Sequence, residues 1–226
     1  LFGLQKPMLV HAMETENLQI LMPLPSRDFD PTEVAVPWRI LKQSGVKIIF
    51  ATPDGKKASC DPKMISGKGL GPAGPFLKAR KDARLAYEEL ERSAEFNHPI
   101  SWNEIEPDQF HGIVLTGGHA KGMREILESS SIQEVTAYFM RSLKPVAAIC
   151  HGVIILARTK KSDGSSAIAG RKVTALLESQ ELTAWRLTKL FAGDYYRTYS
   201  ETVESEVRRA IGSQGIFVRT LTPVLR

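Results

Sequence analysis

The sequence feature that most constrains the fold is a cysteine at the junction of two apolar segments. Cys150 follows the strand-like run PVAAI at 145–149 and precedes the helix-like run GVIILAR at 152–158. A buried strand that turns directly into a helix places the joining residue at a sheet edge and a helix N-terminus, where backbone N–H groups favour a thiolate. A nucleophilic cysteine would occupy such a position. The alternative is an inert buried cysteine, since free cysteines are among the most buried residues.

Strand-like and helix-like segments alternate along most of the chain. Strands are predicted over residues 18–22, 46–52, 111–116, 145–149, 170–176 and 216–220. Helices are predicted over residues 30–44, 123–127, 132–143, 152–158 and 201–211. This alternation predicts an α/β fold in which helices cover both faces of a mostly parallel sheet.

One domain is predicted over residues 18–226, preceded by an N-terminal appendage at 1–17. The segment 60–110 interrupts the alternation with a turn-rich loop at 67–75 and helical spacing over 76–96. We interpret it as an insertion or cap that packs near the sheet edge. Its glycines lack the Gly-Lys-Ser/Thr ending of a phosphate loop.

Composition excludes several classes of function. The 30 Lys and Arg residues exceed the 25 Asp and Glu residues by five, and they are interspersed with the acids, so no nucleic-acid partner is expected. Cys60 and Cys150 are too few for a disulfide framework, which favours a reducing, cytoplasmic compartment. The longest apolar stretch, 145–157, is shorter than a membrane span, so no membrane association is expected.

Several polar or flexible residues follow the predicted strands at their carboxyl ends. Loops at this edge of a parallel sheet lie close together. We therefore expect one site formed by Glu33, Gly117, Gly118, His119, Cys150 and His151. The spacing of His111, His119 and His151 is not a short ligand pattern, so the sequence implies no metal, although a site assembled in space stays open.

Three motifs in this order and spacing resemble the ThiJ/PfpI superfamily: DFDPTE at 28–33, LTGGH at 115–119 and AAICHG at 147–152. The branch most similar to this chain contains the larger proteins related to glyoxalase III and the heat-shock chaperones. The resemblance covers about residues 18–211. It implies the flavodoxin-like fold of class I glutamine amidotransferases.

The resemblance also implies roles for individual residues. Cys150 would be the nucleophile, and Glu33 would be an acidic group in contact with its sulfur. Gly118 would offer its backbone N–H to an oxyanion, and His151 would complete a Cys-His pair. A carboxylate that orients this histidine would come from Glu178 or Glu181, of which Glu178 is preferred.

Each assignment has a structural alternative. Glu33 is explained as the third residue of a helix with Asp30 at its N-cap and Pro31 at its first position. Gly117 and Gly118 fit a turn, and the two acids fit a solvated helix start. His119 fits a loop residue that lines the pocket, and His151 fits a core or surface histidine. The aromatic and basic stretch 193–199 fits a pocket wall, a dimer contact or core.

The leading hypothesis is a cofactor-independent cysteine enzyme of the glyoxalase III type, which converts a small reactive carbonyl such as methylglyoxal to a hydroxy acid. One alternative is a cysteine hydrolase that cleaves an amide or peptide bond with a Cys-His-Glu triad. The other is a stress-response chaperone or redox sensor with little turnover. The family habit suggests a homodimer.

Overall fold

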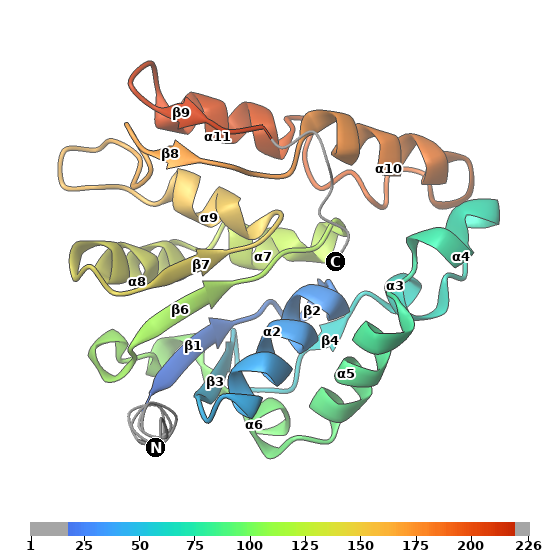
Figure 1. The fold of residues 1–226 in the computed structure, drawn as a ribbon, viewed down its shortest axis with the longest axis horizontal. Coiled ribbons are helices and arrows are strands. Elements are labelled where there is room, and N and C mark those ends of the chain that lie inside the picture. The colour runs from blue at the N-terminus through green and yellow to red at the C-terminus, as the bar shows by residue number, and fades with distance from the viewer. Residues whose placement is uncertain (1–17, 220–226) are drawn as a thin grey trace, which may run out of the picture.

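A central parallel sheet organises the computed structural model, which describes residues 18–219 (Figure 1). Its five strands lie in the order β5–β3–β1–β6–β7. Their bounds are β1 Gln19–Pro23, β3 Lys47–Thr52, β5 Ile100–Ser101, β6 Gly112–Leu115 and β7 Val146–Ala148. The predicted α/β fold is therefore confirmed, while the predicted appendage at 1–17 lies outside the described residues.

Apolar side chains explain the position of the central strands. In β1, Leu21 and Met22 are fully buried, and all four residues of β6 are buried. Strands β1 and β3 pair with Leu21 opposite Ile49. Strands covered on both faces carry continuous apolar runs of this kind rather than an alternating pattern.

Helices pack on this sheet at positions that the sequence largely indicates. Helix α2 (Pro31–Gln43) begins as predicted, because the Asp30 side chain accepts hydrogen bonds from the backbone N–H groups of Thr32 and Glu33. Helix α8 (Ser130–Arg141) packs against β6 and β7, and α9 (Gly152–Arg158) follows β7 directly.

The segment 60–110 contributes to the sheet as well as to the region beside it. Its elements are α3 (Pro62–Ser66), η1 (Gly71–Ala73), α4 (Gly74–Leu77), α5 (Lys81–Glu91), α6 (Ala94–Asn97), β5, η2 (Trp102–Glu104) and η3 (Pro107–Gln109). Strand β5 pairs with β3 as the sheet edge, and α5 packs on α2. Just before α3, β4 (Ser59–Cys60) pairs with β2 (Arg27–Phe29) in a small parallel sheet of its own.

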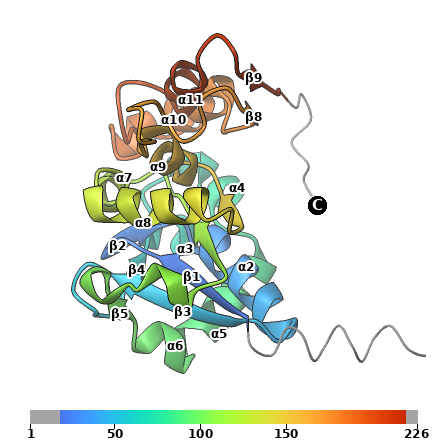
Figure 2. The same cartoon turned by 90° about the vertical axis from the view of Figure 1, so that its left-hand side faces the viewer.

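The C-terminal third differs most from the prediction. It follows a part of the chain in which η4 (Lys121–Met123) and α7 (Arg124–Leu127) lie between β6 and α8. The predicted strand at 170–176 is reduced to β8 (Lys172–Val173), which pairs with β9 (Ile216–Phe217) rather than with β7. Helix α10 (Glu178–Ala192) was not predicted, whereas α11 (Val203–Ile211) was. The elements β8, α10, α11 and β9 gather beyond β7 and α9 (Figures 1 and 2).

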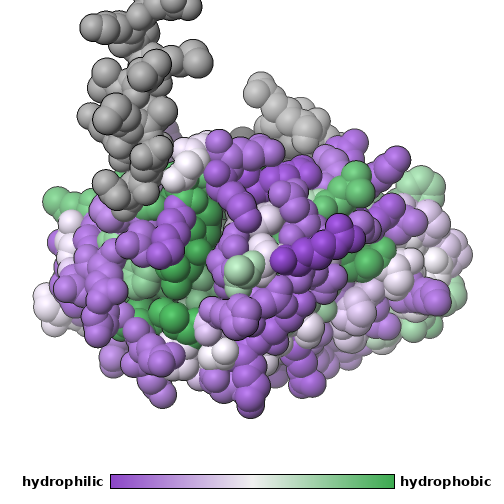
Figure 3. Space-filling model, turned by 90° about the horizontal axis from the view of Figure 1, so that it is seen from below, coloured by the Kyte–Doolittle hydropathy of each residue, from purple (hydrophilic) through white to green (hydrophobic). Residues whose placement is uncertain are grey.

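Polar side chains cover most of the face shown in Figure 3, with apolar side chains gathered in separate patches. The large apolar side chains that are exposed in the described chain are Ile40, Phe76, Leu85, Leu143, Leu187, Leu190, Phe191 and Ile216. No helix within residues 18–219 is long and apolar enough to cross a membrane.

Candidate functional site

Cys150 occupies a strained turn between β7 and α9. Its φ angle is +52°, in the left-handed region that L-residues rarely adopt. The Ile149 N–H donates to the Leu115 carbonyl at 2.9 Å, which fixes the end of β7 against β6. A Cβ on Gly152 would lie 2.4 Å from the same carbonyl oxygen, so only glycine fits here. The turn is therefore held by its neighbours in a geometry that suits a nucleophile elbow.

The N-terminus of α2 meets this turn through the loop that follows β6. The Asp30 N–H donates to the Gly117 carbonyl at 2.9 Å, and the Gly117 N–H donates to Glu33 Oε2 at 2.8 Å. A Cβ on Gly117 would lie 2.7 Å from the backbone nitrogen of His151. The predicted convergence of these three loops is thus observed.

Glu33 lies in this site beside the Cys150 thiol. Burial of its carboxyl group and, after it, the charge of the Asp30 carboxylate raise its pKa to about 8, against the lowering effect of the Gly117 N–H. The carboxyl group therefore holds a proton near neutral pH. A group with this pKa can both donate and accept a proton at physiological pH.

The Cys150 thiol does not have the lowered pKa that we predicted. Burial raises the pKa of the thiol well above its usual range, and the charge of Glu33 raises it further. The N-terminus of α9 opposes this effect, but α9 has only seven residues. A thiolate therefore forms here only when a nearby group takes the proton as the sulfur reacts.

Two histidines flank the sulfur. The His151 Nδ1 lies 3.5 Å from Cys150 Sγ, and the rings of His119 and His151 stack edge to face with centroids 4.9 Å apart. Burial lowers the pKa of His119 to about 4 and that of His151 well below its usual range. Both imidazoles are therefore neutral at physiological pH.

The backbone of Gly118 is free to bind an oxyanion. Within residues 18–219 its N–H donates to no protein acceptor. Its φ angle of +153° favours glycine, and a Cβ would lie 2.9 Å from the Asp28 carbonyl. An unpaired N–H at this sheet edge, near the first N–H groups of α9, is a suitable donor to a developing negative charge.

The predicted triad acid does not reach the histidine. Glu178 Oε2 accepts a hydrogen bond from Thr202 Oγ1, and the buried Glu181 carboxylate pairs with Arg197 and accepts the Val203 N–H. Both acids belong to the first turn of α10, and there they face the loop before α11. Among the described residues no carboxylate hydrogen-bonds the His151 ring.

A positive charge rather than an acid acts on His151. Burial lowers the pKa of His151 most, the neighbouring His119 lowers it next, and the charge of the Arg197 guanidinium lowers it further. This guanidinium lies 3.0 Å from Glu181 Oε1. A triad needs a negative charge to stabilise the imidazolium. The arrangement therefore differs from a Cys-His-Glu triad.

Residues outside the predicted set cover the site. The carboxylate of Asp61, at the N-cap of α3, accepts hydrogen bonds from Tyr196 at 2.8 Å and from Tyr195 at 3.1 Å. A cavity of about 10 Å³ is lined by Asp28, Asp30, Asp61, Met64, Gly118, His119 and Tyr196. The two tyrosines lie in the stretch 193–199, for which a pocket wall was one interpretation. Asp61-Pro62 repeats the Asp30-Pro31 helix start, which was the signal that could have identified Asp61.

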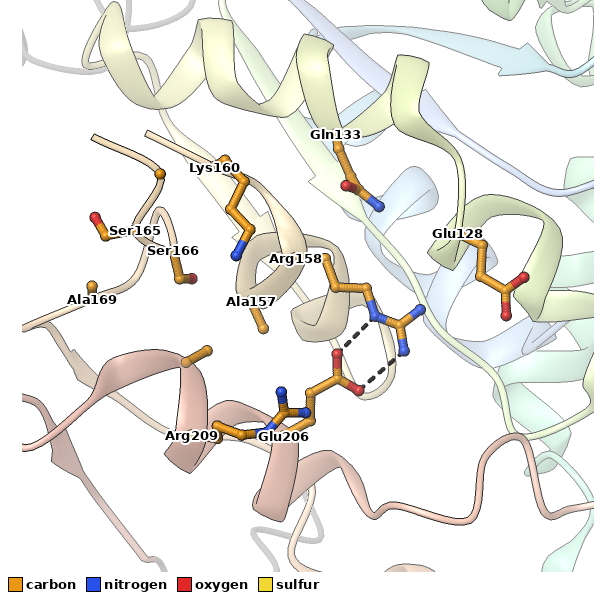
Figure 4. Close-up of a pocket in the computed structure, with 12 residues that line it drawn as sticks. Glu128, Gln133, Ala157, Arg158, Lys160, Ser165, Ser166, Ala169, Glu206 and Arg209 are labelled. Atoms are coloured by element: carbon orange, nitrogen blue, oxygen red, sulfur yellow. Dashed lines mark hydrogen bonds and ion pairs between the residues drawn. The ribbon is translucent and has the colours of Figure 1, made fainter. Parts of the chain in front are cut away.

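A wider hollow of about 660 Å³ lies at the C-terminal end of α9, away from the Cys150 end (Figure 4). Arg158 and Glu206 form a two-point ion pair in its wall, with distances of 2.7 and 3.1 Å. None of the residues predicted for the functional site lines this hollow.

A cysteine on a strand-to-helix turn, above a parallel sheet covered on both faces, defines an α/β protein with a nucleophile elbow. The chain belongs to the family whose model is described as ThiJ/PfpI family-like, and this model matches residues 24–206.

Known proteins show the same relationship. The chain is 24% identical over 155 residues to the glutathione-independent glyoxalase hsp3101 of Schizosaccharomyces pombe, covering 66% of this chain and 59% of that protein. It is 30% identical over 143 residues to protein DJ-1 homolog D of Arabidopsis thaliana, covering 63% of this chain and 31% of that protein. The chain thus spans less than two thirds of these relatives.

The fold is similar to that of glyoxalase III from Candida albicans, with a TM-score of 0.66 at 15% sequence identity. The similarity covers 92% of this chain and 85% of that structure. At this identity the likeness concerns the fold alone.

Proposed function

We propose that this protein is a glutathione-independent glyoxalase that converts methylglyoxal, or a similarly small 2-oxoaldehyde, to a 2-hydroxy acid. The observation that carries the proposal is the position of the Glu33 carboxyl, which accepts the Gly117 N–H at 2.8 Å and lies beside the Cys150 thiol with a pKa raised to about 8. An isomerisation that moves a proton between two adjacent carbons needs one group with a pKa near the working pH. The glyoxalase name of the S. pombe relative agrees with this chemistry.

The first step would be attack of the Cys150 sulfur on the aldehyde carbon. A C–S bond forms, the carbonyl double bond becomes a single bond to oxygen, and the thiol proton passes to that oxygen to give a hemithioacetal. The Gly118 N–H would stabilise the oxyanion as it develops. The raised pKa of the Cys150 thiol requires this coupling of bond formation to proton transfer.

The second step would move a proton from the former aldehyde carbon to its neighbour. Glu33, in its carboxylate form, removes the proton from the hemithioacetal carbon to give an enediolate. The hydroxyl proton passes from the first oxygen to the second, and the second carbon takes its proton back from Glu33, which gives a thioester. Water then cleaves the thioester, which releases lactate and the Cys150 thiol. The sum is methylglyoxal plus water giving lactic acid, with no oxidant or cofactor consumed.

The test is D-lactate formation from methylglyoxal without glutathione, in wild type, Cys150→Ala and Glu33→Gln. We expect Cys150→Ala to abolish turnover and Glu33→Gln to lower kcat by at least about 100-fold, the lower range for a general acid–base group. Circular dichroism of each variant controls for folding. A well-folded wild type that forms no lactate would refute the proposal.

The alternative of a cysteine hydrolase is supported by one distance, the 3.5 Å between Cys150 Sγ and His151 Nδ1. A hydrolase would depend most on His151 as its base, whereas the glyoxalase would depend most on Glu33. Measuring His151→Ala beside Glu33→Gln, with methylglyoxal and with a chromogenic amide or ester, separates the two. Amide or ester cleavage that is lost in His151→Ala but kept in Glu33→Gln would favour the hydrolase.

A further inference from the structure

Three potential metal ligands meet at the sheet edge although they are far apart in the sequence. His119 follows β6, and Cys150 and His151 follow β7. One ligand atom from each, the sulfur and one nitrogen of each ring, lie within 4.8 Å of one another. This cluster combines one thiolate donor with two imidazole donors.

The donor set and its dimensions suit zinc. Zinc binds Cys sulfur at about 2.3 Å and His nitrogen at about 2.0–2.1 Å in a tetrahedral arrangement, which places sulfur and nitrogen roughly 3.5 Å apart. The Cys150 Sγ to His151 Nδ1 distance is 3.5 Å. A ring movement on the order of 1 Å would bring His119 to the same separation.

The ring nitrogens are also available to a metal. Among residues 18–219 the His119 ring makes no hydrogen bond, and the only partner of the His151 ring is Cys150 Sγ, so each ring can offer a nitrogen lone pair. Only the thiol carries a proton that a metal must displace. Binding would follow the balance thiol plus Zn²⁺ giving zinc thiolate plus one H⁺.

The surroundings leave room for a fourth ligand. The cavity of about 10 Å³ that His119 lines is close to the volume that one water needs. Three protein ligands and one exchangeable position characterise open zinc sites.

We propose that Cys150, His119 and His151 bind one Zn²⁺ ion, and that the bound ion blocks the sulfur from reaction. Zinc would thus be a reversible inhibitor at this site and would shield the sulfur from oxidation. The geometry carries this inference independently of the reaction that the cysteine performs.

The test is direct titration of the apo-protein with Zn²⁺ alone, by calorimetry and by competition with a chromophoric chelator. We expect one ion per chain and the release of about one proton in weakly buffered solution. Cys150→Ser and His119→Ala should each weaken binding by at least about tenfold, since even losing a residue behind a ligand costs 10–100-fold. The matched control is His98→Ala, because His98 is exposed at the end of α6 and is not part of the cluster, so this variant should bind zinc as wild type does.

Cobalt gives a second readout that does not depend on activity. Co²⁺ bound in place of zinc should show a sulfur-to-metal charge-transfer band in wild type and His98→Ala, and none in Cys150→Ser. Zinc binding that is unchanged in both Cys150→Ser and His119→Ala would overturn the proposal, as would no binding by folded wild type. Failure of the lactate assay would leave these results intact.

Discussion

The Glu33 side chain occupies the third position of α2 and also accepts the Gly117 N–H across the site. The helix-cap and active-site interpretations therefore describe one residue in two contexts. The sequence could indicate the helix-cap position of Glu33, because Asp30 and Pro31 mark a helix start. It could not indicate the raised pKa of Glu33, which arises from burial by loops that follow distant strands.

The pKa of Glu33 predicts how stability depends on pH. Its folded value of about 8 lies above the ordinary 4.5, so the folded protein keeps a proton that the unfolded chain has released. Stability from this group is full below pH 4.5 and is lost as pH rises through 8. Between pH 6.5 and 8 Glu33 should lower the free energy of unfolding by roughly 1–2 kcal/mol. His119 and His151, whose pKa values are lowered in the folded protein, oppose this fall by a smaller amount, about 0.4 kcal/mol each, as the unfolded chain loses their protons.

Urea denaturation at several pH values between 6.5 and 8 measures this fall. In Glu33→Gln the fall should become clearly smaller, because glutamine does not titrate. An equally steep fall in both proteins would show that Glu33 does not hold its proton in the folded state.

At the scale of elements, the sequence identified the parts of the chain in which apolar periodicity and capping residues agree. Strands β1, β3 and β6 and helices α2 and α11 are of this kind. It missed α10 because its apolar residues do not form one buried stripe; Leu187, Leu190 and Phe191 are exposed. The sequence signal for this helix was a run of 15 residues without Pro or Gly that ends at Gly193.

This omission misplaced the candidate acid. The triad interpretation requires Glu178 to follow a strand of the main sheet. In the structure β8 pairs with β9, and Glu178 is the first residue of α10, which confirms the alternative interpretation of Glu178 as a helix start. Long-range strand pairing of this kind leaves no local pattern in the sequence.

The packing of α9 on β6 predicts the effect of a single methyl group. In Gly152→Ala the new Cβ would meet the backbone oxygens of Leu115 and Thr116 at 2.4 and 2.8 Å, and backbone cannot move aside as a side chain can. We expect a loss of about 1–3 kcal/mol of stability, as for other overpacked sites, and a marked fall in turnover because Cys150 shifts. Urea denaturation and the lactate assay measure both, and wild-type stability in the variant would contradict the packing argument.

At the scale of the whole molecule, the chain before α5 and the chain after α10 meet over the cysteine. The Asp61 carboxylate joins them by accepting from Tyr195 and Tyr196, and η1 packs against α10. The cavity left beneath this contact is small, so opening of the contact would enlarge the space beside Gly118 and His119.

Removing one hydroxyl should loosen this contact. Tyr196→Phe leaves a buried Asp61 oxygen without its 2.8 Å donor, so we expect a loss of about 1–2 kcal/mol of stability and faster reaction of Cys150 with a bulky disulfide reagent. The control is Tyr138→Phe on α8, whose hydroxyl has no hydrogen-bond partner among residues 18–219. Equal thiol reaction rates in the two variants would contradict a closing role for Asp61 and Tyr196.

The contact between Asp61 and the two tyrosines has a kinetic consequence. Under the proposed function, opening of this contact would select aldehydes by size, and the reaction would select them by the reactivity of the carbonyl. When opening is the slower step, aldehydes small enough to enter would share one maximal rate whatever their electrophilicity, and solvent viscosity rather than substrate structure would set that rate.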